Sequence, residues 1–256
     1  MSTPTLKRAD KLLVELGLVN SRVLAQKLIE QGKVSYATST GRRLIPKASF
    51  KLTENDGLEV EGSDLTKYVS RGGLKLEGAL EKAQINPENS IALDVGQSTG
   101  GFSDCLLQHG AKKVIGVEVG HDQLNPKLKN LDSIACLEGI NAREMPKAKL
   151  LEYSPNGFDI IVMDVSFISQ TLILPELVAL LAPKGRIVSL VKPQFEVGKD
   201  GLGKGGIVRD SKQYDVAEMR IRACCQEVGL KIEQYFDSPI KGGDGNKEFF
   251  IVASLA

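Results

Sequence analysis

Apolar residues along this 256-residue chain fall into two patterns, continuous runs and segments with helical spacing. The continuous runs, which are typical of buried strands, lie at residues 91–95, 114–119, 134–137, 158–165 and 186–191. Helical spacing is found at residues 72–83, 102–109, 168–181 and 211–228. Two last runs, 230–236 and 249–253, predict a closing hairpin. Because strands that alternate with helices form parallel sheets, we predict an α/β domain with a mostly parallel sheet and a final antiparallel hairpin strand.

A smaller unit is predicted before this sheet. Residues 8–16 and 22–31 have helical spacing, and Ser21 can cap the second helix. Short strands follow, so the unit is expected to be a small α+β domain. A polar segment then indicates a linker. The predicted organisation is an N-terminal domain at residues 1–61, a linker at 62–71 and a larger domain at 72–256.

The candidate chemistry centres on the glycine-rich segment after the first run of the sheet. Its glycines, which allow the backbone to approach a ligand closely, are Gly96, Gly100 and Gly101. A dinucleotide site favours G-x-G-x-x-G, but Ser98 fills the second glycine position, and Asp94 would repel a phosphate. A carboxylate there suits a cationic sulfonium such as that of S-adenosylmethionine. Glu118 follows some twenty residues later and could accept hydrogen bonds from a ribose diol.

Charge is unevenly spread along a chain whose net charge is +1. Residues 1–51 hold ten Lys or Arg and three Asp or Glu, a net charge of +7, which leaves −6 for residues 52–256. A basic head on an acidic body indicates that the head contacts nucleic acid. A merely solvated basic surface is the alternative.

Several other classes of protein are not favoured by the composition. The four cysteines form no C-x-x-C pair and the two histidines supply no obvious metal set, so we predict reduced thiols and no metal. The first ten residues lack the apolar region of a secretory signal. The longest apolar stretch, residues 172–182, falls short of the roughly 20 residues of a membrane helix. We therefore expect a cytoplasmic protein without a membrane span.

Charged residues are also expected at the carboxyl edge of the predicted sheet. Asp164 and Lys192 end successive strands, and Glu248 begins the returning strand. Because ligands bind at the carboxyl ends of parallel strands, these three residues should lie together. The glycine-rich segments 198–206 and 242–245 lie between them in sequence and could form a lid over a large substrate.

The first domain resembles a known RNA-binding module. The segments Arg8-x-Asp10-Lys11-Leu12-Leu13, Ser21-Arg22 and Ala25-x-x-Leu28-Ile29-x-x-Gly32-Lys33-Val34 are similar to the S-four RNA-binding domain. The resemblance implies an RNA-binding surface. Its candidate residues are Arg8, Lys11, Arg22, Lys27, Lys33, Arg42 and Arg43.

The rest of the chain carries motifs of a second family. They are Ser70-Arg71-Gly72-Gly73-x-Lys75-Leu76, residues 94–102, Met163-Asp164-Val165-Ser166-Phe167, Val191-Lys192-Pro193-Gln194-Phe195-Glu196, Gly205-Gly206-x-Val208-Arg209-Asp210 and Gly245-Asn246-x-Glu248. Together with the first domain they resemble the TlyA family of rRNA 2′-O-methyltransferases of the FtsJ/RrmJ type, which are often labelled haemolysins. The resemblance implies a Rossmann-like S-adenosylmethionine-dependent methyltransferase sheet. The implied substrate is a cytidine of ribosomal RNA, free or in ribosomal subunits.

The family's catalytic tetrad is implied at Lys75, Asp164, Lys192 and Glu248. A 2′-hydroxyl is a poor nucleophile, so it must lose its proton as it attacks a sulfonium methyl group. A lysine can accept that proton when desolvation or a second ammonium disfavours its charged form, and the resemblance favours Lys192 at the hydroxyl. The residues expected to bind the cofactor are Asp94, Gly96, Ser98, Gly100, Gly101, Phe102, Glu118, Asn141 and Asp164.

The cofactor loop departs from the family pattern at Gln97, where a small residue is usual. The side chain of Gln97 either points to solvent or narrows the cofactor pocket, and we expect the second. Three functions therefore stay open: an rRNA 2′-O-methyltransferase, an RNA-binding protein with weak or lost catalysis, and a membrane-lysing haemolysin. We favour the first, because the tetrad is intact.

Overall fold

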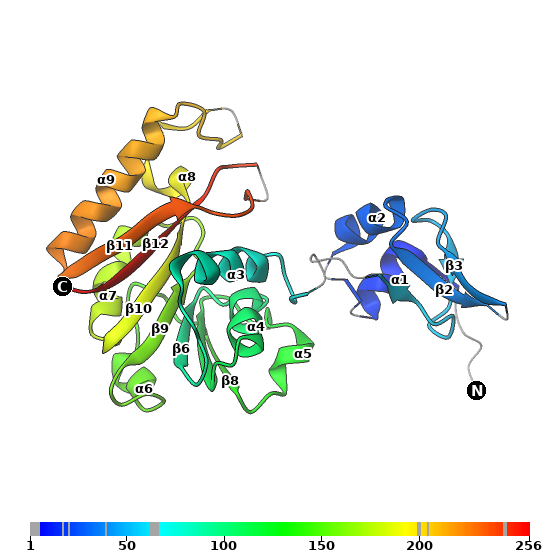
Figure 1. Cartoon of the computed structure of the whole chain (residues 1–256), viewed down its shortest axis with the longest axis horizontal. Helices are drawn as coiled ribbons and strands as arrows, with labels where there is room; N and C mark the ends of the chain where they lie inside the picture. The colour runs from blue at the N-terminus through cyan, green and yellow to red at the C-terminus, as the bar shows by residue number, and fades with distance from the viewer. Residues whose placement is uncertain are drawn as a thin grey trace. The chain divides into compact units, whose positions relative to one another are not determined.

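The chain folds as two compact units, residues 1–70 and 71–256 (Figure 1). The computed structural model describes residues 6–16, 18–19, 21–38, 40–61, 67–198, 201–203, 205–242 and 245–256. Of the linker predicted at 62–71, residues 62–66 lie outside this description.

The N-terminal unit combines two helices with short antiparallel strands. Its elements are β1 (Lys7–Arg8), α1 (Ala9–Glu15), α2 (Arg22–Glu30), β2 (Val34–Thr38), β3 (Gly41–Leu44), β4 (Lys51–Leu52) and β5 (Glu59–Val60). Leu12, Leu13 and Leu28 are buried in its core. The Leu24 amide donates a hydrogen bond to the hydroxyl of Ser21 at 3.2 Å. The predicted cap of the second helix is therefore confirmed.

A seven-stranded sheet organises the larger unit. Its strands are β6 (Ile91–Val95), β7 (Lys113–Glu118), β8 (Ile134–Glu138), β9 (Phe158–Met163), β10 (Leu181–Val191), β11 (Leu230–Asp237) and β12 (Phe249–Leu255). The spatial order is β11-β12-β10-β9-β6-β7-β8. Strands β10, β9, β6, β7 and β8 are parallel, whereas β12 is antiparallel to both β10 and β11. The predicted α/β fold with a final antiparallel hairpin is confirmed.

Helices pack on both faces of this sheet. They are α3 (Gly72–Ala83), α4 (Gly101–Gln108), α5 (Pro126–Lys129), α6 (Lys147–Leu151), α7 (Leu174–Val178), α8 (Pro193–Glu196), α9 (Lys212–Glu227) and the 3₁₀ turn η2 (Gln170–Leu172). One core joins Ile251 of β12 to Leu177 of α7 and Ile221 of α9. The residue before Ile251, Phe250, stacks on Phe102 of α4. Because successive residues of a strand point to opposite faces of the sheet, α4 packs on the other face. In the described ranges no helix is long and apolar enough to cross a membrane.

The helix predicted over residues 168–181 is wrong. The structure has only η2 and α7 there, and β10 already begins at Leu181. The side chain of Gln170 donates to the Leu190 carbonyl at 2.5 Å and accepts from the Ser189 hydroxyl at 2.8 Å. The backbone amide of Gln170 donates to the Glu196 carboxylate at 3.0 Å. Tertiary partners therefore take the hydrogen bonds of Gln170, and Pro175, which lacks an N–H, lies in the first turn of a separate short helix.

Candidate active site

Three strand ends and one helix bring the four candidate catalytic residues to the carboxyl edge of the sheet. Asp164 follows β9, Lys192 follows β10, and Glu248 immediately precedes β12. The neighbours β10 and β12 pair in antiparallel register up to this edge, so Lys192 and Glu248 occupy adjacent positions. Lys75 reaches the edge from the first turn of α3. The sheet order thus gathers residues that are up to 173 positions apart in the sequence.

These residues form two ion pairs. Lys75 Nζ lies 2.5 Å from Glu248 Oε2, and Lys192 Nζ lies 2.6 Å from Asp164 Oδ1. Lys192 also donates to the Ser166 hydroxyl at 2.8 Å. In the described part of the chain, no group of three or more His, Cys, Asp or Glu is placed to hold a metal ion. The two lysine side chains are almost equally covered, with 11% of Lys75 and 12% of Lys192 exposed. The carboxylates differ, since the Asp164 side chain is 24% exposed and that of Glu248 only 3%, so a substrate can approach the Lys192 pair from the Asp164 side.

The glycine loop passes directly beside this edge. Gly96 has φ +81°, and a Cβ there would lie 2.8 Å from the backbone oxygen of Asp164. The Gly96 amide donates to the Val117 carbonyl at 3.0 Å. Only glycine fits both the conformation and the close approach. The loop is therefore fixed between the ends of β7 and β9, next to the accessible ion pair.

Glu118 joins this loop to the end of β7. Its two carboxylate oxygens accept hydrogen bonds from the amides of Ser98 and Gly120, each at 2.9 Å. A carboxylate has about four acceptor positions, so each oxygen keeps capacity for a hydroxyl. The Ile140 amide donates to the Glu118 carbonyl at 2.9 Å, which brings Asn141 to the same edge. This donor and acceptor set fits the ribose of a nucleoside cofactor.

Two of the residues predicted to bind the cofactor, Asp94 and Phe102, have buried side chains. Asp94 is 1% exposed and accepts a 2.6 Å hydrogen bond from the Ser103 hydroxyl. Burial raises the pKa of Asp94 to about 7, against the opposing Ser103 bond, and the charge of Asp164 adds to the rise. Phe102 is 3% exposed and stacks on Phe250. Both side chains therefore anchor α4 from below.

Gln97 is a further buried support of the loop. It is 3% exposed, which excludes a solvent-facing side chain. Its Nε2 donates to the Ser103 hydroxyl at 2.7 Å. A Cβ added at Gly116 of β7 would lie 2.0 Å from Gln97 Cδ, so the amide fills the space that this glycine leaves. Gln97 and Gly116 thus form a matched pair between the loop and the sheet, which the sequence did not reveal.

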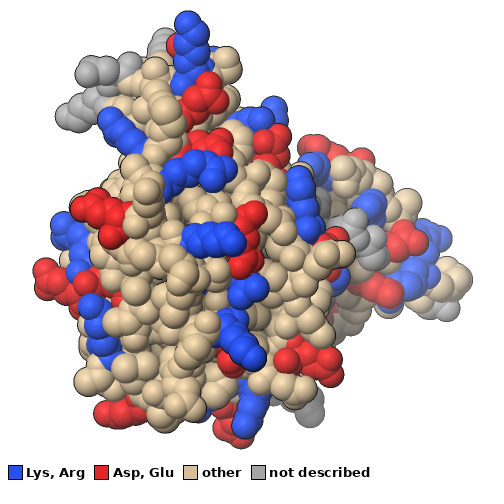
Figure 2. Space-filling model, turned by 60° about the vertical axis from the view of Figure 1, so that its left-hand side comes forward, with Lys and Arg blue, Asp and Glu red and all other residues tan. Residues whose placement is uncertain are grey.

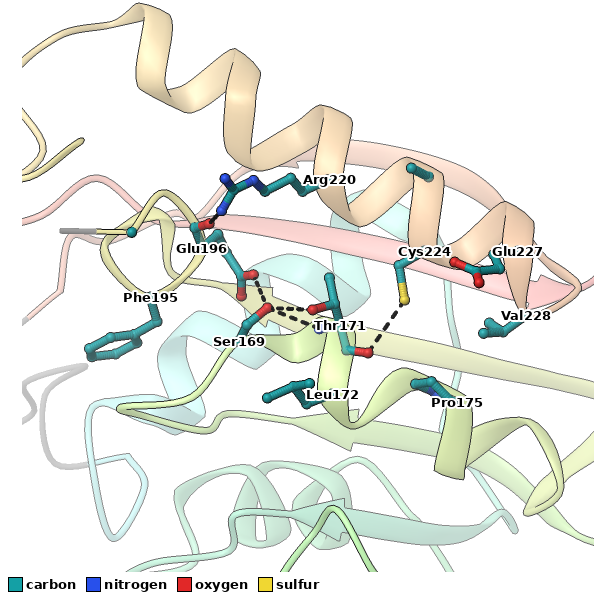
Figure 3. Close-up of a pocket in the computed structure, with 12 residues that line it drawn as sticks. Ser169, Thr171, Leu172, Pro175, Phe195, Glu196, Arg220, Cys224, Glu227 and Val228 are labelled. Atoms are coloured by element: carbon teal, nitrogen blue, oxygen red, sulfur yellow. Dashed lines mark hydrogen bonds between the residues drawn. The ribbon is translucent and has the colours of Figure 1, made fainter. Parts of the chain in front are cut away.

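A pocket of about 720 Å³ opens beside the catalytic edge, between η2, α8 and α9 (Figure 3). Glu196 is buried at its base and accepts a 2.5 Å hydrogen bond from the Ser169 hydroxyl. Burial raises the pKa of Glu196, although the bonds from Ser169 and the Gln170 amide oppose the rise. Arg220 of α9 donates to the Glu196 carbonyl. Phe195, which follows Lys192 by three residues, also lines the pocket.

The most exposed large apolar side chain of the described chain also lies here. Phe167 is 90% exposed, three residues after Asp164. Its backbone has φ +64°, a left-handed conformation that is unusual for an aromatic residue. Its ring lies 5.2 Å from that of Phe195, centroid to centroid. Exposure and local strain at a catalytic edge indicate a binding role.

Asn246 connects the two glycine-rich segments that were predicted to form a lid. It is 3% exposed, accepts from the Val208 amide at 3.1 Å and donates to the Gly206 carbonyl at 3.3 Å. A Cβ at Gly242 would come 2.6 Å from Glu248 Oε1. The described parts of both segments are therefore tied to the start of β12. Residues 199–200, 204 and 243–244 of the predicted lid lie outside the description.

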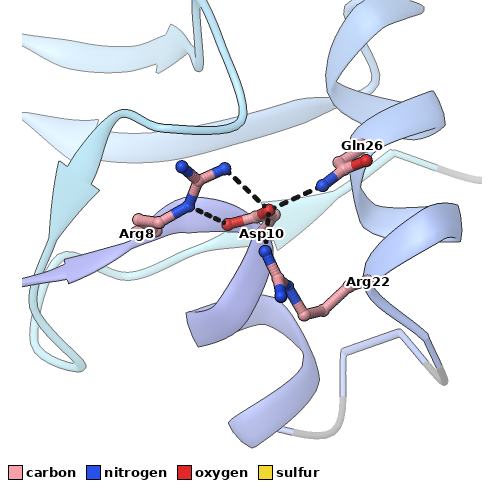
Figure 4. Close-up of polar contacts among 4 residues, drawn as sticks. All are labelled: Arg8, Asp10, Arg22 and Gln26. Carbon is pink, nitrogen blue, oxygen red and sulfur yellow. Dashed lines mark hydrogen bonds and ion pairs between the residues drawn. The ribbon is translucent and has the colours of Figure 1, made fainter.

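The candidate RNA-binding residues of the N-terminal unit differ in their surroundings. Lys11, Lys27 and Arg43 are exposed, and Lys33 is half-buried. Arg42 is held by Glu59 at 2.7 Å, and Arg8 and Arg22 share a contact with Asp10 (Figure 4). On the larger unit, whose face Figure 2 brings forward, charges of both signs are interspersed.

One edge of this open α/β sheet carries a glycine loop, a carboxylate that can bind a ribose, and two lysine–carboxylate ion pairs. This combination is typical of methyltransferase domains that use a nucleoside cofactor. The model of FtsJ-like methyltransferases matches residues 68–255, and that of the S4 domain matches residues 7–36. The chain belongs to the FtsJ-like methyltransferase family.

Similar proteins span nearly the whole chain. A candidate rRNA methyltransferase of Bacillus subtilis, YqxC, is 42% identical over 96% of this chain and 84% of its own length. The 16S/23S rRNA (cytidine-2′-O)-methyltransferase TlyA of Mycobacterium tuberculosis is 38% identical over 95% of this chain and 88% of its own. A solved structure of a candidate hemolysin from Streptococcus thermophilus is 37% identical, with a TM-score of 0.74 over 100% of this chain and 90% of its own.

We predict that Gln97 and Gly116 are energetically coupled. Gln97→Ala removes the hydrogen bond to Ser103 and leaves a cavity above Gly116. The free energy of unfolding should therefore fall by about 1–3 kcal/mol. Gly116→Ala should also destabilise, because its Cβ must displace Gln97 Cδ. The double variant should lose less than the two losses combined, as measured by urea unfolding in a double-mutant cycle. Strict additivity would show that the two residues are independent.

A second prediction concerns Asp94 and pH. The pKa of Asp94 is about 7 in the folded protein, whereas the ordinary pKa of an aspartate, expected in the unfolded chain, is 3.8. The protonated group therefore stabilises the fold at low pH, and this contribution is lost as the pH rises from about 4 to about 7. Asp94→Asn should therefore gain stability relative to the wild type between pH 4 and pH 8. The gain is at most about 4 kcal/mol, since a tenfold change in proton affinity corresponds to roughly 1.4 kcal/mol. A stability difference that does not vary with pH would contradict the assignment.

Proposed function

We propose that this protein transfers a methyl group from S-adenosylmethionine to a ribose 2′-hydroxyl of ribosomal RNA, with cytidine as the target nucleoside. The observation that carries the proposal is the accessible Lys192–Asp164 pair, which lies beside the glycine loop and the buried Lys75–Glu248 pair. Relatives that cover most of the chain are named as rRNA methyltransferases, which supports the substrate class. An rRNA substrate also implies action in the cytoplasm.

The residues that would hold the cofactor are those of the loop and the two strand ends beside it. Gly96, Gly100 and Gly101 leave room for close approach, and Glu118 has acceptor capacity for the ribose hydroxyls. Asn141 borders the same edge. When bound, S-adenosylmethionine supplies an electrophilic methyl group. Asp94 and Phe102 would act from beneath by fixing α4 and the loop.

Lys192 is the residue we assign to the hydroxyl. Asp164 and Ser166 hold its Nζ at 2.6 and 2.8 Å, so its position is fixed before a substrate arrives. Lys192 would take up the proton of the 2′-hydroxyl as the oxygen attacks, after its ammonium has passed a proton to solvent, and Asp164 would stabilise the ammonium that forms again. Lys75, neutralised by Glu248, would hold α3 at the edge. Positioning the hydroxyl in line with the methyl group would contribute most, since such orientation can be worth roughly 7–11 kcal/mol.

The aromatic pair Phe167 and Phe195 would bind the target base. Sequence-specific recognition of RNA mostly targets unstacked bases, which bind on aromatic rings. Phe167 is exposed three residues from Asp164, and Phe195 follows Lys192 by the same spacing. A base on this platform would place its own ribose next to Lys192. The N-terminal domain, residues 1–61, would supply further affinity for ribosomal RNA.

The direct test of this function is Lys192→Ala. Methyl transfer from labelled S-adenosylmethionine to ribosomal subunits of cells that lack the protein should fall below detection, because the hydroxyl loses its proton acceptor. RNA affinity should stay within twofold of the wild type. The matched control is Lys184→Ala, an exposed lysine of the same strand β10 near its other end. Near-normal turnover in Lys192→Ala would refute the assigned role.

The platform is tested by two substitutions at Phe167. Phe167→Ala should lower kcat/KM for RNA by about 5–150-fold, since base stacking is worth about 1–3 kcal/mol. Phe167→Gly should lower it equally and yet not destabilise the fold, because glycine adopts positive φ without strain. Phe167→Tyr should stay close to the wild type. Equal kcat/KM values for Phe167→Ala and the wild type would exclude stacking.

A further inference from the structure

Two segments of the larger unit, one that follows β9 and one that follows β10, contact each other at three successive points. The first contact is the ion pair of Lys192 and Asp164 at 2.6 Å. Three residues further along each segment, the rings of Phe195 and Phe167 lie 5.2 Å apart, centroid to centroid. The third contact belongs to the carboxylate of Glu196. A lysine, an aromatic pair and a carboxylate therefore follow one another in this order.

The Glu196 carboxylate is held by the protein and still borders an open cavity. It is 3% exposed and lines the pocket between η2, α8 and α9 (Figure 3). Its Oε2 accepts from the Ser169 hydroxyl at 2.5 Å, and its Oε1 accepts from the backbone amide of Gln170 at 3.0 Å. An ionised carboxylate has about four acceptor positions and no donor. These two bonds therefore leave acceptor capacity for an N–H group of a ligand.

The rest of the pocket suits a nucleobase, which has apolar faces and a polar edge. Its volume of about 720 Å³ lies within the range of roughly 300–1,000 Å³ that is usual for small-molecule sites. Phe195 lies at one end, and Val228 lies at the other (Figure 3). Further apolar walls come from Leu172, Pro175 and Ala223. The pocket thus combines a ring for stacking, apolar sides and one buried acceptor.

The spacing along α8 matches the two ends of a single nucleoside. Lys192 is the residue before α8 and Glu196 is its last residue, so about one helical turn of 5.4 Å separates them. A nucleoside with its 2′-hydroxyl at Lys192 can lay its base on the rings and direct the edge of that base to Glu196.

We propose that Glu196 accepts a hydrogen bond from the exocyclic amino group of the target cytosine and thereby selects cytidine over uridine. The inference rests on the proposed function and names the residue that reads the base. Cytosine presents an N–H₂ donor at this position, which carboxylates accept in nucleic-acid recognition. Uracil presents a carbonyl oxygen there instead, and two acceptors that face each other cannot form a hydrogen bond.

A purely structural role for Glu196 makes a different prediction. If Glu196 only ties η2 to α8, its substitution changes activity on every substrate by the same factor. If it reads the base, its substitution changes the ratio of kcat/KM between cytidine and uridine substrates. That ratio is therefore the quantity to measure.

The wild-type protein is tested first, on the ribosomal RNA fragment that carries the methylated nucleotide. The fragment is made with cytidine, uridine or the pyrimidin-2-one ribonucleoside at that position, the last being cytidine without its amino group. Both replacements should lower kcat/KM for methyl transfer by about 10–150-fold, the scale of a hydrogen bond to a charged group.

Glu196→Gln should reduce this discrimination to within about threefold, because a carboxamide offers both an acceptor and donors. Glu152→Gln, an exposed glutamate at the end of α6, is the matched control and should keep the wild-type ratio. Circular dichroism checks that each variant is folded. If Glu196→Gln does not fold, Glu196→Asp decides in its place, because it keeps the charge and draws the carboxylate back by one methylene.

Two results would overturn the assignment of Glu196 and leave the proposed function standing. One is equal kcat/KM of the wild-type protein on all three RNA fragments. The other is a wild-type ratio in the folded Glu196 variant. A wild-type protein that methylates none of the fragments would contradict the proposed function itself, and the role of Glu196 with it.

Discussion

A buried lysine and a buried glutamate must neutralise each other, and this requirement shapes the active edge of the protein. Lys75 and Glu248 meet at 2.5 Å with side chains that are 11% and 3% exposed. Breaking such a pair from one side costs about 3–5 kcal/mol, because the remaining charge stays buried without a partner. The pair therefore ties α3 to the start of β12. Since β12 lies next to β10, the same constraint places Lys192 at the edge.

The glycine loop depends on a second set of buried contacts. Its backbone is fixed by Glu118 and the Val117 carbonyl, and its underside by Gln97, Ser103 and Asp94. Glycine is required where the chain approaches the end of β9. The loop is therefore held by its contacts with the ends of β7 and β9 and with α4. In the N-terminal unit, the buried carboxylate of Asp10 likewise holds the side chains of Arg8 and Arg22.

The sequence predicted the sheet well, because continuous apolar runs and strand–helix alternation are strong local signals. It also placed Asp164, Lys192 and Glu248 together, since parallel strands end at a common edge. It failed for the helix at 168–181, where the tertiary partners of Gln170 overrode helical spacing. The sequence also did not predict that the side chain of Gln97 packs against Gly116 of β7. Contacts between distant segments decide such features, and local patterns do not encode them.

In the proposed function, the Lys192–Asp164 pair acts on a ribose hydroxyl of ribosomal RNA. The most direct measurement is product identity: ribosomal subunits from cells that lack the protein are incubated with it and methyl-labelled S-adenosylmethionine, and the RNA is digested to nucleosides. Mass spectrometry should find the label in 2′-O-methylcytidine. Label on a nucleobase, or on the protein component of the subunits, would contradict the account.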